Sequence, residues 1–199
     1  MSGPDDIPIT YQRVAVEWDR ARNRSLFEET WLTRAVAGLE PGARVLDLGC
    51  GAGEPVAGWL IAQGFAVTGV DIAPAMLEIA KDRFPAARWI CADMRGLDLG
   101  ERFDAVIAFD SFFHLSPQAQ QDMFATFAQH LTSGGHLLFT CGPDVGEPIG
   151  SVAGVPVYHA SLSPAHYAQL LEQNGLIARR FVAQDPECAG RSLWLAQRR

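Results

Sequence analysis

The chain has 199 residues, 48% of them hydrophobic, and a formal net charge of −7 at pH 7. This acidic balance opposes binding to a phosphate backbone, so we expect no nucleic-acid partner. The sequence has no apolar run long enough to cross a bilayer, and its first residues lack the basic and apolar regions of a signal peptide. We therefore expect a cytoplasmic protein with no membrane partner, folded as one domain over residues 1–199.

The cysteines and histidines indicate neither a disulfide framework nor a metal site. The four cysteines, at positions 50, 91, 141 and 188, form no C-x-x-C pair. The five histidines show no H-E-x-x-H arrangement and no other ligand spacing. We expect reduced thiols and no bound metal.

Two helices are predicted ahead of the first strand, over residues 11–23 and 25–38. Their apolar residues recur at near-helical spacing, and the pattern ends at Pro41-Gly42. Residues 1–40 are therefore expected to form an N-terminal helical cap.

Strands and helices then alternate through the middle of the chain. Strands are predicted over residues 44–48, 65–71, 87–92, 103–109 and 136–140, and helices over 55–63, 74–83 and 117–130. Such alternation implies parallel strands joined by crossover helices.

The C-terminal part of the chain breaks this alternation. Residues 141–162 are rich in Gly and Pro and are expected to form a loop that contacts a substrate. A helix over 163–173 and strands over 176–184 and 192–197 follow. The seven residues between these strands are too few for a parallel crossover, so the strands should pair antiparallel. The predicted fold class is α/β, a Rossmann-like doubly wound sheet of seven strands, mostly parallel with an antiparallel last strand.

A glycine-rich turn follows the first strand. Gly49, Gly51 and Gly53 stand at alternate positions before a helix, where glycine leaves room for a ligand and for unusual backbone angles. The dinucleotide fingerprint G-x-G-x-x-G would need a glycine at position 54 or 56, where the chain has Glu54 and Val56. Asp47 and Glu54 also favour a ligand that carries positive charge over a pyrophosphate.

Three further motifs follow in order, each at the end of a predicted strand. The second strand ends at Asp71, the third is followed by Asp93-Met94, and the fourth leads into a segment from Asp110 to Leu115. From about Val45 to the C-terminus, this order of motifs resembles that of the class I S-adenosylmethionine (SAM)-dependent methyltransferases.

The resemblance implies a role for each motif in binding SAM or its demethylated product, S-adenosylhomocysteine (SAH). Asp71 would bind the ribose hydroxyls, Ile72 and Met94 would contact the adenine, and Asp93 would accept from the adenine amino group. The full predicted cofactor site comprises Tyr11, Arg22, Asp47, Gly49, Cys50, Gly51, Gly53, Asp71, Ile72, Met76, Asp93, Met94 and Asp110.

Structural roles remain open at several of these positions. Asp71 could be a helix N-cap, and Asp93 could serve a turn. Met94 could be a core residue. Cys50 is a small filler rather than a nucleophile, because no neighbour in the sequence would lower its pKa.

The candidate catalytic residues are Asp110 and His114, which flank the loop after the fourth strand and would face the transferable methyl group. His114 could act as a general base or could hold the loop by a backbone hydrogen bond, and Asp110 could instead contact the methionine moiety. The loop lacks the two prolines found in relatives that methylate nucleic-acid amino groups. We therefore expect a small-molecule acceptor, contacted by Trp18, Phe113, Tyr158 and His159, although helix or loop packing would also explain these residues.

The sequence thus predicts an enzyme that moves a methyl group from SAM to an unidentified small molecule. Two alternatives remain: a SAM-binding protein without turnover, and a nicotinamide-dependent oxidoreductase, which the glycine spacing disfavours. The methylated atom, the acceptor and the oligomeric state do not follow from the sequence.

Overall fold

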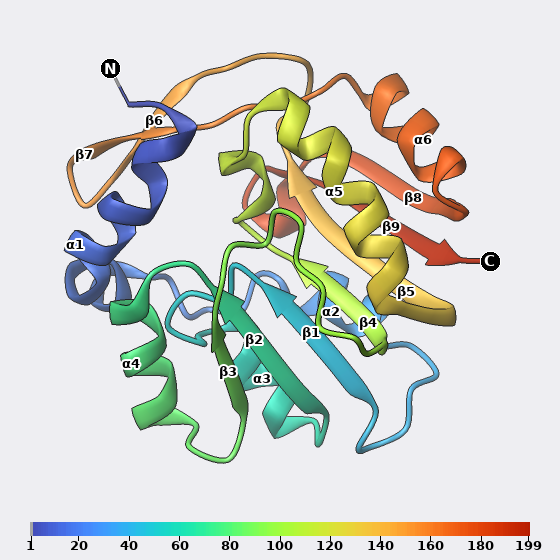
Figure 1. The fold of residues 1–199 in the computed structure, drawn as a ribbon, viewed down its shortest axis with the longest axis horizontal. Coiled ribbons are helices and arrows are strands. Elements are labelled where there is room, and N and C mark those ends of the chain that lie inside the picture. The colour runs from blue at the N-terminus through green and yellow to red at the C-terminus, as the bar shows by residue number, and fades with distance from the viewer. Residues whose placement is uncertain (1) are drawn as a thin grey trace.

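A computed structural model describes residues 2–199, whose strands form one seven-stranded sheet and one short hairpin (Figure 1). The order in the large sheet is β3-β2-β1-β4-β5-β9-β8. Its strands are β1 (Arg44–Leu48), β2 (Ala66–Asp71), β3 (Arg88–Cys91), β4 (Phe103–Ala108), β5 (Leu131–Cys141), β8 (Leu176–Asp185) and β9 (Arg191–Arg198). The hairpin consists of β6 (Ile149–Val152) and β7 (Val155–Tyr158).

Strand pairing agrees with the predicted doubly wound topology. Strands β3, β2, β1, β4 and β5 pair in parallel, whereas β9 is antiparallel to both β5 and β8. The prediction of a mostly parallel sheet with an antiparallel last strand is therefore confirmed. The strand order reverses between β1 and β4, and the crevice at such a switch point is the usual ligand site of this architecture.

Helices cover both faces of the sheet. The α-helices are α1 (Ile7–Ala21), α2 (Glu29–Ala35), α3 (Val56–Ala62), α4 (Pro74–Arg83), α5 (Pro117–His130) and α6 (Pro164–Gln173). Three 3-10 turns are η1 (Pro4–Asp6), η2 (Phe112–His114) and η3 (Pro186–Cys188). Side chains of α5 and α6 pack in one core cluster, and those of α2 and α3 pack in a second.

Strand β4 shows why the sheet separates two cores. Its side chains alternate, so that Val106 and Ala108 join the cluster under α5 while Ala105 and Ile107 join the cluster under α2 and α3. All four are fully buried, as expected for a parallel strand covered by helices on both faces.

Some predicted elements differ from the observed ones. Helix α1 begins four residues earlier than predicted, because Pro8 is tolerated in a first helical turn. Helix α2 covers only residues 29–35 of the predicted 25–38, and β5 starts at Leu131, directly after α5, rather than at residue 136.

The predicted loop over residues 141–162 contains the β6–β7 hairpin. Ala153 and Gly154 have φ angles of +47° and +75°, the left-handed conformations of a two-residue hairpin turn. Val157 and Tyr158 of β7 then pack against Ile7 at the start of α1. The arrowheads of β1, β2 and β4 point toward α1, so α1 and the hairpin lie over the carboxyl ends of these strands (Figure 1).

The aromatic core under α5 generates a stability prediction. Phe127 is fully buried, and its ring centroid lies 5.5 Å from that of Phe112, 5.7 Å from that of Phe124 and 6.2 Å from that of Phe139. Phe127→Ala should lower the free energy of unfolding by about 3–5 kcal/mol, because it leaves a cavity in this cluster. Urea denaturation measures the change. Asp122→Ala, on the exposed face of α5, is the control and should change stability by less than about 0.5 kcal/mol. Equal effects of the two substitutions would contradict the prediction.

Candidate functional site

A cavity of about 990 Å³ lies at the carboxyl ends of β1, β2 and β4. Helix α1 contributes one wall, and the glycine-rich turn contributes another. Of the residues predicted from the sequence, those that line it are Tyr11, Trp18, Arg22, Asp47, Gly49, Cys50, Gly51, Asp71, Ile72, Met76, Asp93, Met94, Asp110 and His114. We call this space the cofactor cavity.

The glycine turn is fixed by its neighbours as well as by its backbone. Gly49 has a φ of +73°, and a Cβ atom there would stand 2.2 Å from the Cβ of Ser111. Ser111 in turn donates from its hydroxyl to the carbonyl oxygen of Leu48 at 2.6 Å. Gly53 does not line the cavity: a Cβ on it would meet Trp89 and Phe84 at 3.2–3.3 Å. Close packing and a φ of +82° thus explain why residue 53 is a glycine.

Asp71 ends β2 with its carboxylate held by two backbone groups. The N–H of Gly51 donates to one oxygen and the N–H of Ala73 to the other, both at 2.8 Å. Burial raises the pKa of this carboxyl group, while the backbone donors oppose the rise. Asp71 therefore joins the glycine turn to the start of α4 and still faces the cavity.

Asp93 and Met94 reach the cavity from the segment after β3. The Arg95 guanidinium donates to both carboxylate oxygens of Asp93. Oδ2 accepts from Nε at 2.8 Å and from Nη2 at 2.6 Å, and Oδ1 accepts from Nε at 3.1 Å. The backbone N–H of Arg95 adds a turn hydrogen bond to Oδ1. The turn role left open as an alternative for Asp93 is therefore seen in this structure, together with its position at the cavity wall.

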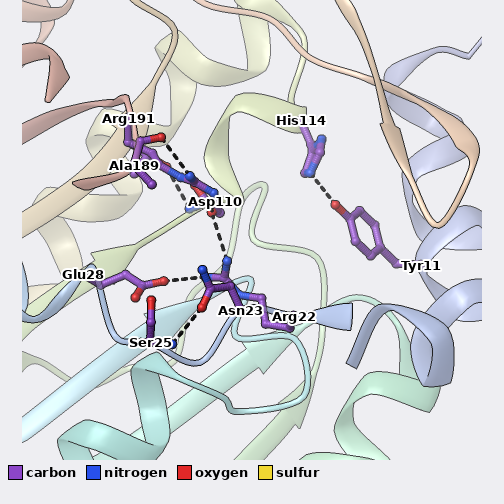
Figure 2. Close-up of polar contacts among 10 residues, drawn as sticks. Tyr11, Arg22, Asn23, Ser25, Glu28, Asp110, His114, Ala189 and Arg191 are labelled. Carbon is purple, nitrogen blue, oxygen red and sulfur yellow. Dashed lines mark hydrogen bonds and ion pairs between the residues drawn. The ribbon is translucent and has the colours of Figure 1, made fainter. Parts of the chain in front are cut away.

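Asp110 meets two arginines from opposite ends of the chain (Figure 2). Arg191 donates to its Oδ1 from Nε at 3.3 Å and to its Oδ2 from Nη2 at 3.0 Å. Arg22 Nη1 lies 3.6 Å from Oδ2, and Arg22 Nη2 donates at 2.7 Å to Glu28, which is fully buried. Asp110 itself has a φ of +48°, and its N–H donates to the hydroxyl of Thr140 at 2.7 Å.

Sequence reasoning missed Glu28 and Arg191. Glu28 stands in a predicted helix and Arg191 in a predicted turn, where charged residues usually face solvent. Asp110, the partner of Arg191, lies 81 residues away in the sequence and becomes its neighbour only through the strand order of the sheet. No local pattern distinguishes either Glu28 or Arg191 from a solvated side chain.

His114 is buried between Tyr11 and the β6–β7 hairpin (Figure 2). Its Nδ1 lies 2.8 Å from the carbonyl oxygen of Tyr158, and its Nε2 lies 2.8 Å from the Tyr11 hydroxyl. A carbonyl oxygen can only accept, so Nδ1 carries the proton and the Tyr11 hydroxyl donates to Nε2. Burial lowers the pKa of His114 to about 4, which keeps the imidazole neutral.

A second cavity of about 940 Å³ adjoins the first. The two share Tyr11, Trp18, Arg22, Asp110 and His114 in their walls. Phe113 and His159, predicted to contact the substrate, line this second cavity. Tyr158 lines neither cavity with its side chain, whose hydroxyl donates to Glu147. We call this space the acceptor-side cavity.

Residues 45–135 match the model of a family described as a methyltransferase domain. The chain is 34% identical over 107 residues to a malonyl-[acyl-carrier protein] O-methyltransferase of Anoxybacillus flavithermus, covering 51% of this chain and 40% of that protein. It is 40% identical over 78 residues to a magnesium-protoporphyrin O-methyltransferase of Rhodobacter capsulatus, covering 37% and 34%. The chain spans between 28% and 57% of the length of the curated relatives it matches.

Solved structures show the same fold over nearly the whole chain. A magnesium protoporphyrin IX methyltransferase from Synechocystis with bound SAM has a TM-score of 0.75 at 17% identity, covering 100% of this chain and 98% of that one. An amino pentose methyltransferase from Micromonospora echinaspora with bound SAM has a TM-score of 0.72 at 23% identity, covering 93% and 95%.

Within residues 2–199, no helix has the length and apolar character needed to span a membrane. The matched segment, the strand order and the shared fold all agree with the family that the sequence motifs predicted. Residues 45–135 match a methyltransferase domain, and the chain has the fold of methyltransferases that bind SAM.

Proposed function

We propose that this protein binds SAM in the cofactor cavity and transfers its methyl group to a small-molecule acceptor. The observation that carries the proposal is that two carboxylates, the buried Asp47 and the half-buried Asp71, lie beside the glycine turn at the switch point of the sheet. A ligand with hydroxyl donors and positive charge suits these carboxylate acceptors better than a pyrophosphate does.

The ribose of SAM would bind at Asp71. A carboxylate has about four acceptor positions, and the N–H groups of Gly51 and Ala73 use two of them. The remaining two can accept from a pair of vicinal hydroxyls. Because the backbone bonds fix the carboxylate in place, little side-chain freedom is lost when the ribose binds.

Asp47 would face a positive group of the ligand. Only 2% of Asp47 is exposed, and its Oδ2 has no hydrogen-bond partner among residues 2–199. Burial, and then the charge of Asp71, raise its pKa to about 7. A buried acid without a partner is costly, and a cationic ligand would relieve that cost. SAM carries such charge on its ammonium and sulfonium groups.

The apolar part of the cavity would hold the adenine. Ile72, Met76 and Met94 line it from the segments that follow β2 and β3. Asp93 lies at the same wall, and its carboxylate could accept from the adenine amino group while it keeps the Arg95 pair.

The shared wall of the two cavities is where the methyl group would pass. When bound, SAM supplies a methyl group already activated on sulfonium, so positioning and exclusion of water can provide most of the acceleration. Tyr11 presents a neutral hydroxyl at this wall, since burial raises its pKa, and His114 Nε2 accepts the Tyr11 proton in a hydrogen bond.

Of the two roles left open for His114, the geometry favours holding the loop. With a pKa of about 4, its imidazole is a weak base, and its Nδ1–H is committed to the Tyr158 carbonyl. We assign His114 as a positioning residue that orients Tyr11, and Tyr11 as the group closest to the reacting atoms.

A small-molecule acceptor is supported by the second cavity and by the names of relatives. One relative is named for magnesium-protoporphyrin, and another, from Streptomyces fradiae, for a dTDP-linked amino sugar. The walls of the second cavity combine the aromatic rings of Phe113 and His159 with a few charged groups, as is usual for small-molecule sites.

Calorimetric titration tests the cofactor. The protein should bind SAM and SAH with micromolar affinity and should not bind NAD. Asp71→Ala should weaken binding of SAM and SAH by about 2–4 kcal/mol, because two charge-assisted hydrogen bonds to the ribose are lost. Asp122→Ala on the exposed face of α5 is the control and should bind like wild type. Unchanged affinity of Asp71→Ala for SAM would overturn the assignment of Asp71 to the ribose, and binding of NAD alone would overturn the assignment of the cofactor. Binding of SAM with no SAH formed from any acceptor would favour a binding protein without turnover.

Asp47 makes stability depend on pH in a direction that can be measured. Its folded-state pKa of about 7 lies above the unfolded value of about 3.9, so the folded state retains the proton and loses relative stability as pH rises from about 4 to 7. Asp47→Asn should therefore stabilise the free protein by about 2–4 kcal/mol at about pH 8 and by little near pH 4. Urea denaturation at both pH values measures the difference. The same gain in the free energy of unfolding at both pH values would show that Asp47 is not the titrating group.

The Tyr11 hydroxyl is tested by Tyr11→Phe. The variant should bind SAH within about threefold of wild type and should reduce the turnover of an acceptor found by screening by about tenfold or more. Tyr158→Phe is the matched control, because its hydroxyl lies at Glu147, away from both cavities. His114→Asn should lower turnover without moving the pH profile, since a positioning residue does not titrate in the reaction. A shifted pH profile in His114→Asn would restore the general-base role.

A further inference from the structure

The acceptor-side cavity has two chemically different walls. On one side, the rings of Phe113, His114 and His159 contact one another, with centroids 4.8–4.9 Å apart. Burial lowers the pKa of both imidazoles, so this wall is uncharged and aromatic. On the other side stand the guanidinium groups of Arg22 and Arg191, with the carboxylate of Asp110 between them (Figure 2).

Arg191 is held rigidly in this second wall. Asp110 accepts from its Nε and Nη2, the carbonyl oxygen of Ala189 accepts from its Nη1 at 3.1 Å, and its guanidinium lies 4.6 Å from the ring centroid of Phe27. The side chain nevertheless remains 30% exposed. Such anchoring fixes the direction of any donor that is still free.

Two of the five N–H groups of Arg191 are uncommitted. Nη1 and Nη2 each carry two hydrogens, and each uses one of them on Ala189 or Asp110. One N–H on each nitrogen is therefore left. A planar anion can accept from two such donors at once, which is the bidentate geometry that arginine favours.

Arg22 offers less to a ligand in this cavity. Its Nη2 is bound to the buried carboxylate of Glu28 behind it, and its Nη1 faces Asp110. The charges of Arg22 and Glu28 balance, as do those of Arg191 and Asp110. A ligand that approaches Arg191 therefore also approaches Asp110, which favours a singly charged anion over a doubly charged phosphate.

We propose that the acceptor carries a carboxylate group, which Arg191 binds through its free N–H groups, and an apolar body that packs on Phe113 and His159. The inference rests on the proposed function, because it assigns this cavity to the methyl acceptor. Arg191 and His159 both lie outside the matched residues 45–135. Features that select an acceptor are expected in these outer segments rather than in the matched one.

Matched probes on the SAH-loaded protein test the proposal. Benzoate and benzamide have the same shape and differ in charge, and phenyl phosphate presents a doubly charged anion on a similar ring. Titrations followed by NMR should show that benzoate binds about tenfold more tightly than benzamide, and more tightly than phenyl phosphate. Arg191→Gln should abolish the preference for benzoate, and Arg191→Lys should retain part of it because the charge remains without the planar fork.

Arg179→Gln is the matched control, since it removes the same charge from the exposed face of β8, where Arg179 binds Gln197. It should keep the preference for benzoate. Circular dichroism and SAH affinity establish that each variant is folded. If SAH binds but benzoate is not preferred, or if Arg179→Gln abolishes the preference as well, the carboxylate proposal fails while the proposed cofactor stands. If phenyl phosphate binds more tightly than benzoate, the acceptor class is wrong. Failure of SAH to bind would reject the proposed function, and the carboxylate proposal with it.

Discussion

The position of Asp110, two residues after the end of β4, is the constraint on which the two cavities depend. Its left-handed φ of +48° turns the chain out of the sheet, and the Thr140 hydroxyl on β5 holds its N–H. Its carboxylate then binds Arg22 from the N-terminal segment and Arg191 from the start of β9. One side chain thus joins three parts of the sequence. Without it, two guanidinium groups would lie side by side with only Glu28 to balance them.

A second constraint is the cost of the carboxylates under the glycine turn. Burial raises the pKa values of both Asp47 and Asp71, and the charge of Asp71 further disfavours ionisation of Asp47. A protein selected for stability alone would place apolar groups at such positions. The free protein is therefore less stable than its fold allows, and a cationic ligand with hydroxyl groups would recover part of that loss.

The sequence predicted the elements whose ends carry local signals. Helices 74–83 and 117–130 were predicted with their observed bounds, because each begins with a proline and Ser116 caps the second by accepting from the N–H of Ala119. The β6–β7 hairpin was missed because its Gly and Pro residues are typical of a loop. The hairpin is stabilised by packing on Ile7, which lies over a hundred residues away in the sequence. The Asp110–Arg191 pair, 81 residues apart, likewise depends on the strand order and on no local pattern.

The residues with local sequence signals and those without them line different parts of the site. The segment that matches the methyltransferase family, residues 45–135, contributes the glycine turn, Asp71 and Asp93, whose spacing the sequence displays. The acceptor-side cavity adds α1, the β6–β7 hairpin and the start of β9, all outside that segment. Relatives named for malonyl-[acyl-carrier protein], magnesium-protoporphyrin and an amino sugar match this chain over only part of its length. Under the proposed function, the surrounding segments select the acceptor while the matched segment binds the cofactor. Arg191 and His159 would then carry more information about the acceptor than the motifs do.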